Sequence, residues 1–290
     1  MEAFSELLLA GALGLGLALG RVWPFPARCS ALTRACILLL VGALGVTLAS
    51  EPSLGLLQLL LPALGAAVAM LAVAVLVVRG VRRPRADRVS APSEPRTSSP
   101  WALPAAIVAG VVIGYLVGTA SPGLRAPAGT AVEVFLLALL FLVGWEAKLE
   151  LKALRELPLP FLAGLLASAA GAVVLFLLTG EPWRVAFAST LAFGWYTLAG
   201  PAVAQAVSPV AGTLAFLVNF LREDLTMVSA PWVGRWAGAP AIAASGGATS
   251  MDTTLYFVTR YGRRDAAALA LAVGTLFTLL APVLLALLLA

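Results

Sequence analysis

A succession of apolar stretches, most of them about as long as a bilayer is thick, constrains this chain more than any other feature. A membrane-spanning α-helix needs about 20 mostly apolar residues. Six stretches in the first 179 residues are interpreted as such segments: 4–19, 31–49, 54–78, 101–120, 131–144 and 159–179. Four later stretches also have spanning length, although glycine, proline or charge interrupts three of them: 184–207, 210–236, 239–256 and 265–290. Because lipid leaves only helices and closed barrels as spanning structures, we predict an all-α polytopic membrane protein with ten hydrophobic segments.

The composition restricts the function as well as the fold. With 61% hydrophobic and 11% charged residues, the chain lacks the roughly 25% charge of a soluble domain. It has no histidine and two cysteines, Cys29 and Cys36, so a zinc site is not expected. An intramembrane hydrolase needs a Ser-His, Ser-Lys or paired-Asp arrangement. Since histidine is absent and both lysines lie at a predicted cytoplasmic edge, we expect no enzyme.

The basic residues indicate the topology. If the N-terminus is outside and ten segments cross, fifteen of the nineteen Lys and Arg residues fall in inner loops, which fits the positive-inside rule. If the segments around Gly194 and Gly247 are re-entrant hairpins, eight crossings remain and Arg235 also moves inside. Both versions predict that the two termini are external. Because the basic residues are dispersed over loops, no nucleic-acid partner is expected.

One long polar segment, 79–100, interrupts the apolar pattern and is rich in arginine and proline. It divides the chain into an N-terminal three-helix segment, 1–78, and a transport core, 101–290. We interpret 79–100 as a basic cytoplasmic linker. Attraction of its arginines to anionic lipid is the alternative.

The seventh segment is predicted to be broken near its middle. Gly194, Gly200 and Pro201 follow one another closely there, and proline removes a backbone donor. Transporters place substrate sites at such breaks, so Trp195, Tyr196 and Thr197 are candidate site residues. The alternative is an aromatic packing position flanked by small helix-contact residues.

The eighth segment contains a polar stripe at membrane depth. At 100° per residue, Asn219, Arg222, Glu223 and Thr226 share one face, whereas Asp224 points elsewhere. The stripe is expected to face the protein interior. Two carboxylates and one guanidinium leave a negative surplus that suits a cationic ligand. The alternative is that Arg222 neutralises an acidic neighbour and the cluster only joins helices.

A second carboxylate, Asp252, follows a run of glycines and hydroxyl residues. A central Asp in a spanning helix costs roughly 2.5–3.5 kcal/mol on an insertion scale. The spacing predicts Thr249 as the N-cap and Asp252 as the N3 residue of a helix that begins within the membrane. Such a helix start attracts an anionic group. The candidate site residues of this segment are Gly246, Gly247, Thr249, Ser250, Asp252, Thr253 and Thr254.

Together these motifs resemble those of the bacterial lysine exporters of the LysO type. The resemblance rests on four groups of residues and is convincing from about 130 to 290: Phe141-Leu142-Val143-Gly144, Phe193-Gly194-Trp195-Tyr196, Asn219 with Arg222-Glu223, and Gly247-Ala248-Thr249-Ser250-Met251-Asp252 with Thr254-Leu255. The chain departs from the family pattern at Thr197 and Tyr256, where serine and proline are expected.

The resemblance implies export of L-lysine and close cationic analogues across the bacterial inner membrane, with Glu223 and Asp252 as the essential acids. It also implies kinship with cation/proton antiporters and bile-acid-type symporters, which have inverted repeats and crossed broken helices. We expect alternating access coupled to entry of H⁺ or Na⁺. Whether a Na⁺ binds near Asp252 is left open. No cofactor is expected. The expected partners are lysine and the bilayer. Formation of a homodimer is left open. The alternative function is a monovalent cation/proton antiporter without an amino acid substrate.

Overall fold

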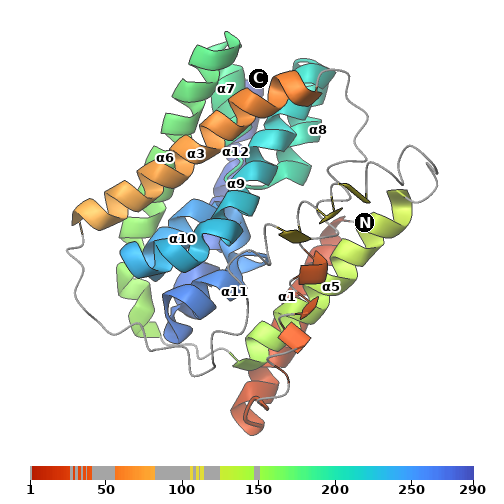
Figure 1. Ribbon diagram of the computed structural model, residues 1–290, viewed down its shortest axis with the longest axis vertical. Coiled ribbons are helices and arrows are strands. Elements are labelled where there is room, and N and C mark those ends of the chain that lie inside the picture. Colours follow the sequence, from red (N-terminus) through yellow and green to blue (C-terminus); the bar gives the residue numbers. More distant parts are fainter. Residues whose placement is uncertain are drawn as a thin grey trace. The chain divides into compact units, whose positions relative to one another are not determined.

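The computed structural model describes residues 2–26, 29, 32–33, 35–36, 38–40, 56–81, 105–106, 109–110, 112–113, 125–146 and 151–290. Every regular element in these residues is helical, which confirms the predicted all-α class (Figure 1). Most of the predicted segments 31–49 and 101–120 and most of the linker 79–100 lie outside the described residues. The chain forms two compact units, Met1–Pro52 with Pro92–Lys148 and Ser53–Ala91 with Leu149–Ala290. The predicted division at 79–100 stays a prediction.

The first unit contains α1 (Glu2–Val22) and α5 (Arg125–Glu146), which pack together through glycines. A Cβ added to Gly144 would lie 2.6 Å from Leu13 O, so only glycine lets the two backbones approach this closely. At one end of the pair, Trp145 Nε1 donates a hydrogen bond to Trp23 O at 2.9 Å.

The second unit is built on four long helices: α3 (Leu56–Val81), α6 (Pro158–Thr179), α9 (Pro209–Trp236) and α12 (Ala267–Leu289). Among the described helices, α3, α6 and α12 are long and apolar enough to cross a membrane. Helix α9 has 28 residues but contains the charged cluster Arg222-Glu223-Asp224. It begins at a capped turn in which Ser208 Oγ accepts from Ala211 N.

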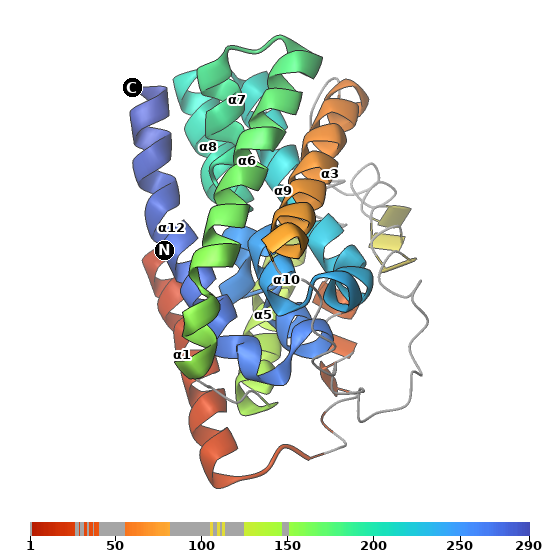
Figure 2. The ribbon, with the colours of Figure 1, turned by 90° about the vertical axis from the view of Figure 1, so that its left-hand side faces the viewer.

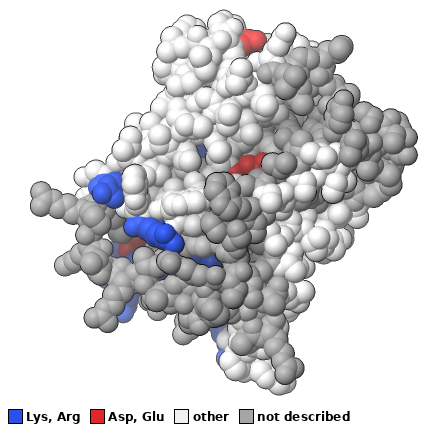
Figure 3. Space-filling view, viewed as in Figure 1, with Lys and Arg blue, Asp and Glu red and all other residues white. Residues whose placement is uncertain are grey.

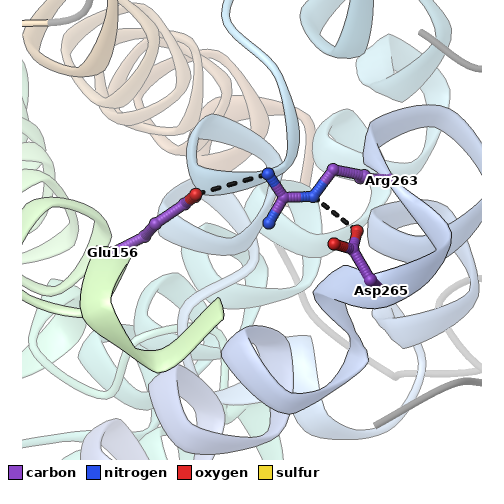
Figure 4. Close-up of polar contacts among 3 residues, drawn as sticks. All are labelled: Glu156, Arg263 and Asp265. Atoms are coloured by element: carbon purple, nitrogen blue, oxygen red, sulfur yellow. Dashed lines mark hydrogen bonds and ion pairs between the residues drawn. The ribbon is translucent and has the colours of Figure 1, made fainter. Parts of the chain in front are cut away.

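Contacts between helix ends define one end of this unit, here called the Arg79 end. Arg79, in the last turn of α3, donates to Trp236 O at 3.0 Å, so α3 and α9 finish side by side. The short helix η2 (Leu151–Glu156) precedes α6, and its Glu156 binds Arg263, which also binds Asp265 in η5 (Arg264–Ala266) before α12 (Figure 4). The Arg79 end therefore holds the ends of α3 and α9 and the beginnings of α6 and α12.

Two interrupted segments lie between the long helices. The first hairpin consists of α7 (Trp183–Thr190) and α8 (Tyr196–Ala206). It begins after α6 and returns to the start of α9, both at the end opposite the Arg79 end. Helix α8 runs alongside the first half of α9. The two helices approach closely, since a Cβ added to Gly212 would lie 2.4 Å from Ala204 Cβ. Figure 2 shows α7 beside α6 at this end.

The second hairpin consists of α10 (Ala239–Gly246), η3 (Gly247–Met251), α11 (Leu255–Phe257) and η4 (Val258–Gly262). It begins just after α9, and a Cβ on Gly262 would lie 2.6 Å from Ala239 Cα. Its start and finish are therefore adjacent at the Arg79 end. The predicted helix interruptions near Gly194 and Gly247 are confirmed, and the two hairpins enter the unit from opposite ends.

Candidate functional site

The tips of the two hairpins touch each other at the two predicted breaks. Ala248 N donates a hydrogen bond to Phe193 O at 2.8 Å. Gly247 has a φ of 66°, and a Cβ there would lie 2.4 Å from Phe193 O. Gly194 has a φ of 99°, and a Cβ there would lie 3.0 Å from Gly246 O. Left-handed backbone and a close approach together require glycine at both tips.

Asn219, near the middle of α9, hydrogen-bonds to the backbone on both sides of the break in the first hairpin. Its Oδ1 accepts from Gly194 N at 2.8 Å, and its Nδ2 donates to Ser189 O at 2.6 Å and to Ala215 O at 2.8 Å. The side chain is fully buried. Ser189 O and Gly194 N are backbone groups that the helix break leaves without an intrahelical partner, so the amide satisfies one acceptor and one donor at the break.

Arg222, one turn further along α9, closes the end of α10 in the second hairpin. Its Nε donates to Ser245 O at 2.8 Å, and its Nη2 donates to Ala244 O at 3.1 Å. Its Nη1 donates to Ser168 Oγ of α6 at 2.7 Å. A cation at the C-terminus of a helix is favourable because the last carbonyls carry partial negative charge. The alternative that Arg222 merely neutralises an acidic neighbour is not supported, since these donors are directed to carbonyls and a hydroxyl.

Glu223 and Asp252 are brought together by Thr253. The Thr253 hydroxyl and backbone N–H both donate to Asp252 Oδ1, at 3.2 and 2.5 Å. The same threonine side chain hydrogen-bonds to Glu223, which also interacts electrostatically with Asp252. Glu223 is 1% exposed, and its Oε1 has no hydrogen-bond partner among the described residues. The two predicted acids thus share one hydroxyl, and one carboxyl oxygen is left for a ligand.

The predicted helix cap at Thr249 is wrong. Thr249 lies inside η3, and the chain leaves the helical conformation at Asp252, which has φ −127° and ψ −100°. Helix α11 then begins at Leu255, after Thr254. The reason is the glycine pair: Gly247 adopts φ 66°, so a single turn of 3₁₀ helix replaces the expected helix start.

The other predicted hydroxyls support the second hairpin. Thr249 Oγ1 donates to Gly246 O at 3.1 Å and lies 3.4 Å from Thr254 Oγ1. Ser250 Oγ lies 2.8 Å from both Gly247 O and Ala270 O, which joins the tip to α12. Thr226 Oγ1 donates to Arg222 O within α9. Thr249 and Ser250 thus fix the loop around Asp252, Thr226 bonds only to its own helix, and Thr253 contacts the acids.

The three predicted site residues at the first break, Trp195, Tyr196 and Thr197, differ in their surroundings. Tyr196, the first residue of α8, lies over α9, with its ring 5.2 Å from Phe216 and 5.7 Å from Phe220. It interacts electrostatically with Glu223, Asp252 and Asp224. Trp195 is half-buried, and Thr197 is exposed. Of the three, only Tyr196 is brought to the acids.

The sequence interpretation left out Asp224 because its helical angle differs from that of the stripe. The structure nevertheless buries it to 6% exposure, and its Oδ1 has no hydrogen-bond partner in the described part of the chain. Ser168, the Arg222 partner on α6, was also missed. Its only signal was a small polar residue at helical spacing from Gly164 and Gly171 in an otherwise apolar segment.

Negative charge is concentrated at this site. Figure 3 shows a small acidic patch near the middle of one face, bordered mostly by uncharged atoms, with Lys and Arg side chains lower on the same face. Glu223, Asp224, Asp252 and Arg222 give a formal surplus of negative charge within the second unit. Among the described residues no group of three metal-ligating side chains occurs. The surplus of negative charge suits a cationic ligand.

Comparison with known proteins identifies the family. The family model described as "Lysine exporter LysO" matches residues 105–289. This chain belongs to the lysine exporter family. The matched region of this chain includes both hairpins and α9, so every site residue described above lies within it. The family is one of transporters.

Two curated proteins are similar to this chain in sequence. The chain is 31% identical over 182 residues to "Lysine exporter LysO" of Escherichia coli (strain K12), a match that covers 61% of this chain and 60% of that protein. It is 29% identical over 186 residues to "Putative lysine exporter" of Haemophilus influenzae (strain ATCC 51907 / DSM 11121 / KW20 / Rd), covering 62% of this chain and 93% of that protein. The match thus spans about 60% of the length of the Escherichia coli relative. No solved structure matches.

Proposed function

We propose that this protein exports L-lysine and close cationic analogues across the bacterial inner membrane by alternating access, coupled to entry of a proton. The observation that carries the proposal is the pair of buried Glu223 and half-buried Asp252, joined by the Thr253 hydroxyl at the meeting point of two broken helices. The names of the two relatives support the substrate class.

The arrangement of the helix ends supports the re-entrant version of the topology. Arg79 precedes the arginine-rich segment and therefore belongs to the cytoplasmic side under the positive-inside rule. Arg79 contacts Trp236, so Arg235 is cytoplasmic in this proposal. The first hairpin then enters from outside and the second from the cytoplasm, as an inverted repeat requires. Eight crossings and two external termini follow.

A cysteine placed at position 235 tests this topology. In the proposed arrangement, a membrane-impermeant thiol reagent modifies Arg235→Cys only when it reaches the cytoplasmic face, in inside-out vesicles. The native Cys29 and Cys36 are replaced by serine in this background. Labelling from the external face of intact cells would refute the re-entrant second hairpin, and a cysteine at position 181, between α6 and α7, provides the opposite control.

The single hydroxyl proton of Thr253 suggests how lysine and a proton compete. A hydroxyl donates one hydrogen bond at a time. When Thr253 donates to Asp252, its oxygen can accept only from a protonated Glu223. An ammonium group that binds Glu223 and Asp252 replaces that proton, because it donates to carboxylates directly. Only one of the two cations is therefore bound at a time, which is what an exchanger needs.

Coupling to an entering cation also agrees with the energetics of export. Moving one positive charge outward against 100 mV, negative inside, costs about 2.3 kcal/mol. One proton entering for each lysine cation leaving makes the charge movement zero. The α-carboxylate of lysine can face the start of α8 at the first break, since the N-terminus of a helix favours negative charge.

Flux of radiolabelled lysine in proteoliposomes tests the function. We expect Glu223→Gln and Asp252→Asn to reduce lysine flux to background, because each removes a carboxylate that holds the ammonium or the proton. Glu181→Gln is the matched control, since Glu181 lies in the loop between α6 and α7, and we expect wild-type flux. Near-normal flux in both acid variants would refute the proposal. Cation/proton exchange by the wild type that is indifferent to lysine would support the antiporter alternative instead.

A further inference from the structure

Asp224 is a buried carboxylate that the proposed exchange does not use. It is 6% exposed, and its Oδ1 is buried without a hydrogen-bond partner in the part of the chain that the structure describes. Asn219 and Arg222, on the same helix, have partners for their polar atoms. An unsatisfied carboxylate is costly in a low-dielectric environment, so a ligand that supplies the missing donor is the natural partner.

Three aromatic rings lead along α9 to this carboxylate. Phe216 and Phe220 are stacked with ring centroids 5.8 Å apart, and Tyr196 of α8 meets both of them edge-on. Phe220 precedes Asp224 by one helical turn, so the two side chains share one face of α9. Tyr196 interacts electrostatically with Asp224 as well as with Glu223 and Asp252. The rings therefore lie along the same face as one carboxylate and near the other two.

Rings beside a carboxylate favour an organic ammonium on an alkyl chain. The carboxylate accepts hydrogen bonds from the ammonium, while aromatic faces attract the cation and cover its methylene groups. A small hydrated metal ion instead needs several oxygen ligands.

We propose that Asp224, with the rings of Tyr196, Phe216 and Phe220, binds the second ammonium group of a diamino substrate whose first ammonium is held by Glu223 and Asp252. This inference rests on the proposed function and names the residue that gives the site its selectivity. Consecutive helix residues diverge by about 100°, so the two carboxylates of Glu223 and Asp224 point to separate places. The distance between them then selects the length of the alkyl chain.

Substrate length gives a test that a merely structural Asp224 would not affect. Counterflow of radiolabelled lysine in proteoliposomes is inhibited with unlabelled lysine, ornithine, which is one methylene shorter, and norleucine, which lacks the second amino group. In the wild type, lysine is expected to inhibit at a concentration at least tenfold lower than norleucine. Asp224→Asn should reduce that advantage at least tenfold. Asp224→Glu advances the carboxylate by one methylene and should shift the ornithine-to-lysine preference at least threefold toward ornithine.

The outcomes separate the two proposals. If wild-type liposomes show no lysine counterflow, the proposed function fails and this inference fails with it. If the wild type transports lysine while both Asp224 variants keep the wild-type order and ratios, only this inference is overturned. A variant too slow for counterflow is compared by the rise in melting temperature that each ligand produces. Selective stabilisation of Asp224→Asn by lysine over norleucine, equal to that of the wild type, would also overturn the inference. Glu181→Gln is the control that should change no ratio.

Discussion

Asn219→Ala should open the break in the first hairpin without unfolding the rest of the second unit. The amide makes two hydrogen bonds to that hairpin, from Gly194 N at 2.8 Å and to Ser189 O at 2.6 Å. Alanine leaves both backbone groups buried without a partner, and each such group costs about 1–3 kcal/mol. The expected loss of local stability is therefore roughly 2–6 kcal/mol.

Hydrogen–deuterium exchange read by mass spectrometry measures this loss where it occurs. Local opening controls the exchange of protected amides, and about 1.4 kcal/mol corresponds to a tenfold change. A loss of about 2 kcal/mol should thus accelerate exchange in peptides that cover 187–198 by roughly 30-fold. Peptides from α6 and α12 should change much less, because the hydrogen bonds of the Asn219 side chain go to the first hairpin and to α9 itself.

Thr226→Ala is the matched control. Thr226 is equally buried on α9, 2% exposed, but its hydroxyl bonds only to Arg222 O of its own helix. Its removal leaves no backbone group of a hairpin without a partner, so peptides 187–198 should exchange as in the wild type. If Asn219→Ala and Thr226→Ala exchange alike in those peptides, Asn219 does not hold the break, and the assignment of its role is refuted.

Two further predictions concern the second hairpin and the Arg79 end. Gly247→Ala should lower the melting temperature strongly, because the φ of 66° alone costs about 1–3 kcal/mol for alanine and the new Cβ would collide with Phe193 O. Gly80→Ala is the control and should change the melting temperature little, since a Cβ there has nothing within 4 Å. Equal effects of the two substitutions would contradict the close approach of the hairpin tips. Arg263→Gln should cost under about 1 kcal/mol, because the Arg263 side chain is 41% exposed and exposed ion pairs are weak. Its small shift in melting temperature should vanish in about 1 M salt, where charges are screened beyond about 3 Å, and a shift that survives would show that Arg263 acts through packing.

The sequence predicted the positions at which the helices break because local chemistry determines them. Glycines at 194 and 247 permit left-handed backbone, and both breaks lie at these residues. The acids were predictable from their cost in an apolar segment. Their approach to each other was not, since it depends on Thr253, whose position follows from the turn at Asp252 and not from helical periodicity.

The roles of Asn219, Arg222 and Asp224 show where periodicity misled. One polar stripe suggested one shared ligand site, but the residues of the stripe have different partners. Asn219 and Arg222 bind backbone groups of the two hairpins, and such groups exist only after the chain has folded. Asp224 was set aside because its angle differs by 100° from that of Glu223. It is nevertheless buried, because α8 returns along α9 and brings Tyr196 over the neighbouring face.

The two hairpins differ in how they can respond to a cation at Glu223. The first is attached to α9 by Asn219, a neutral amide whose hydrogen bonds do not depend on protonation. The second contributes Thr253 and Asp252, whose contacts with Glu223 change when a proton or an ammonium is exchanged. Arg222 holds the end of α10 through carbonyls that carry no titratable group. A change of bound cation is therefore felt first in residues 252–254, beyond the Arg222 contacts, so movement within the second unit is expected to begin in that loop and not in α7 or α8.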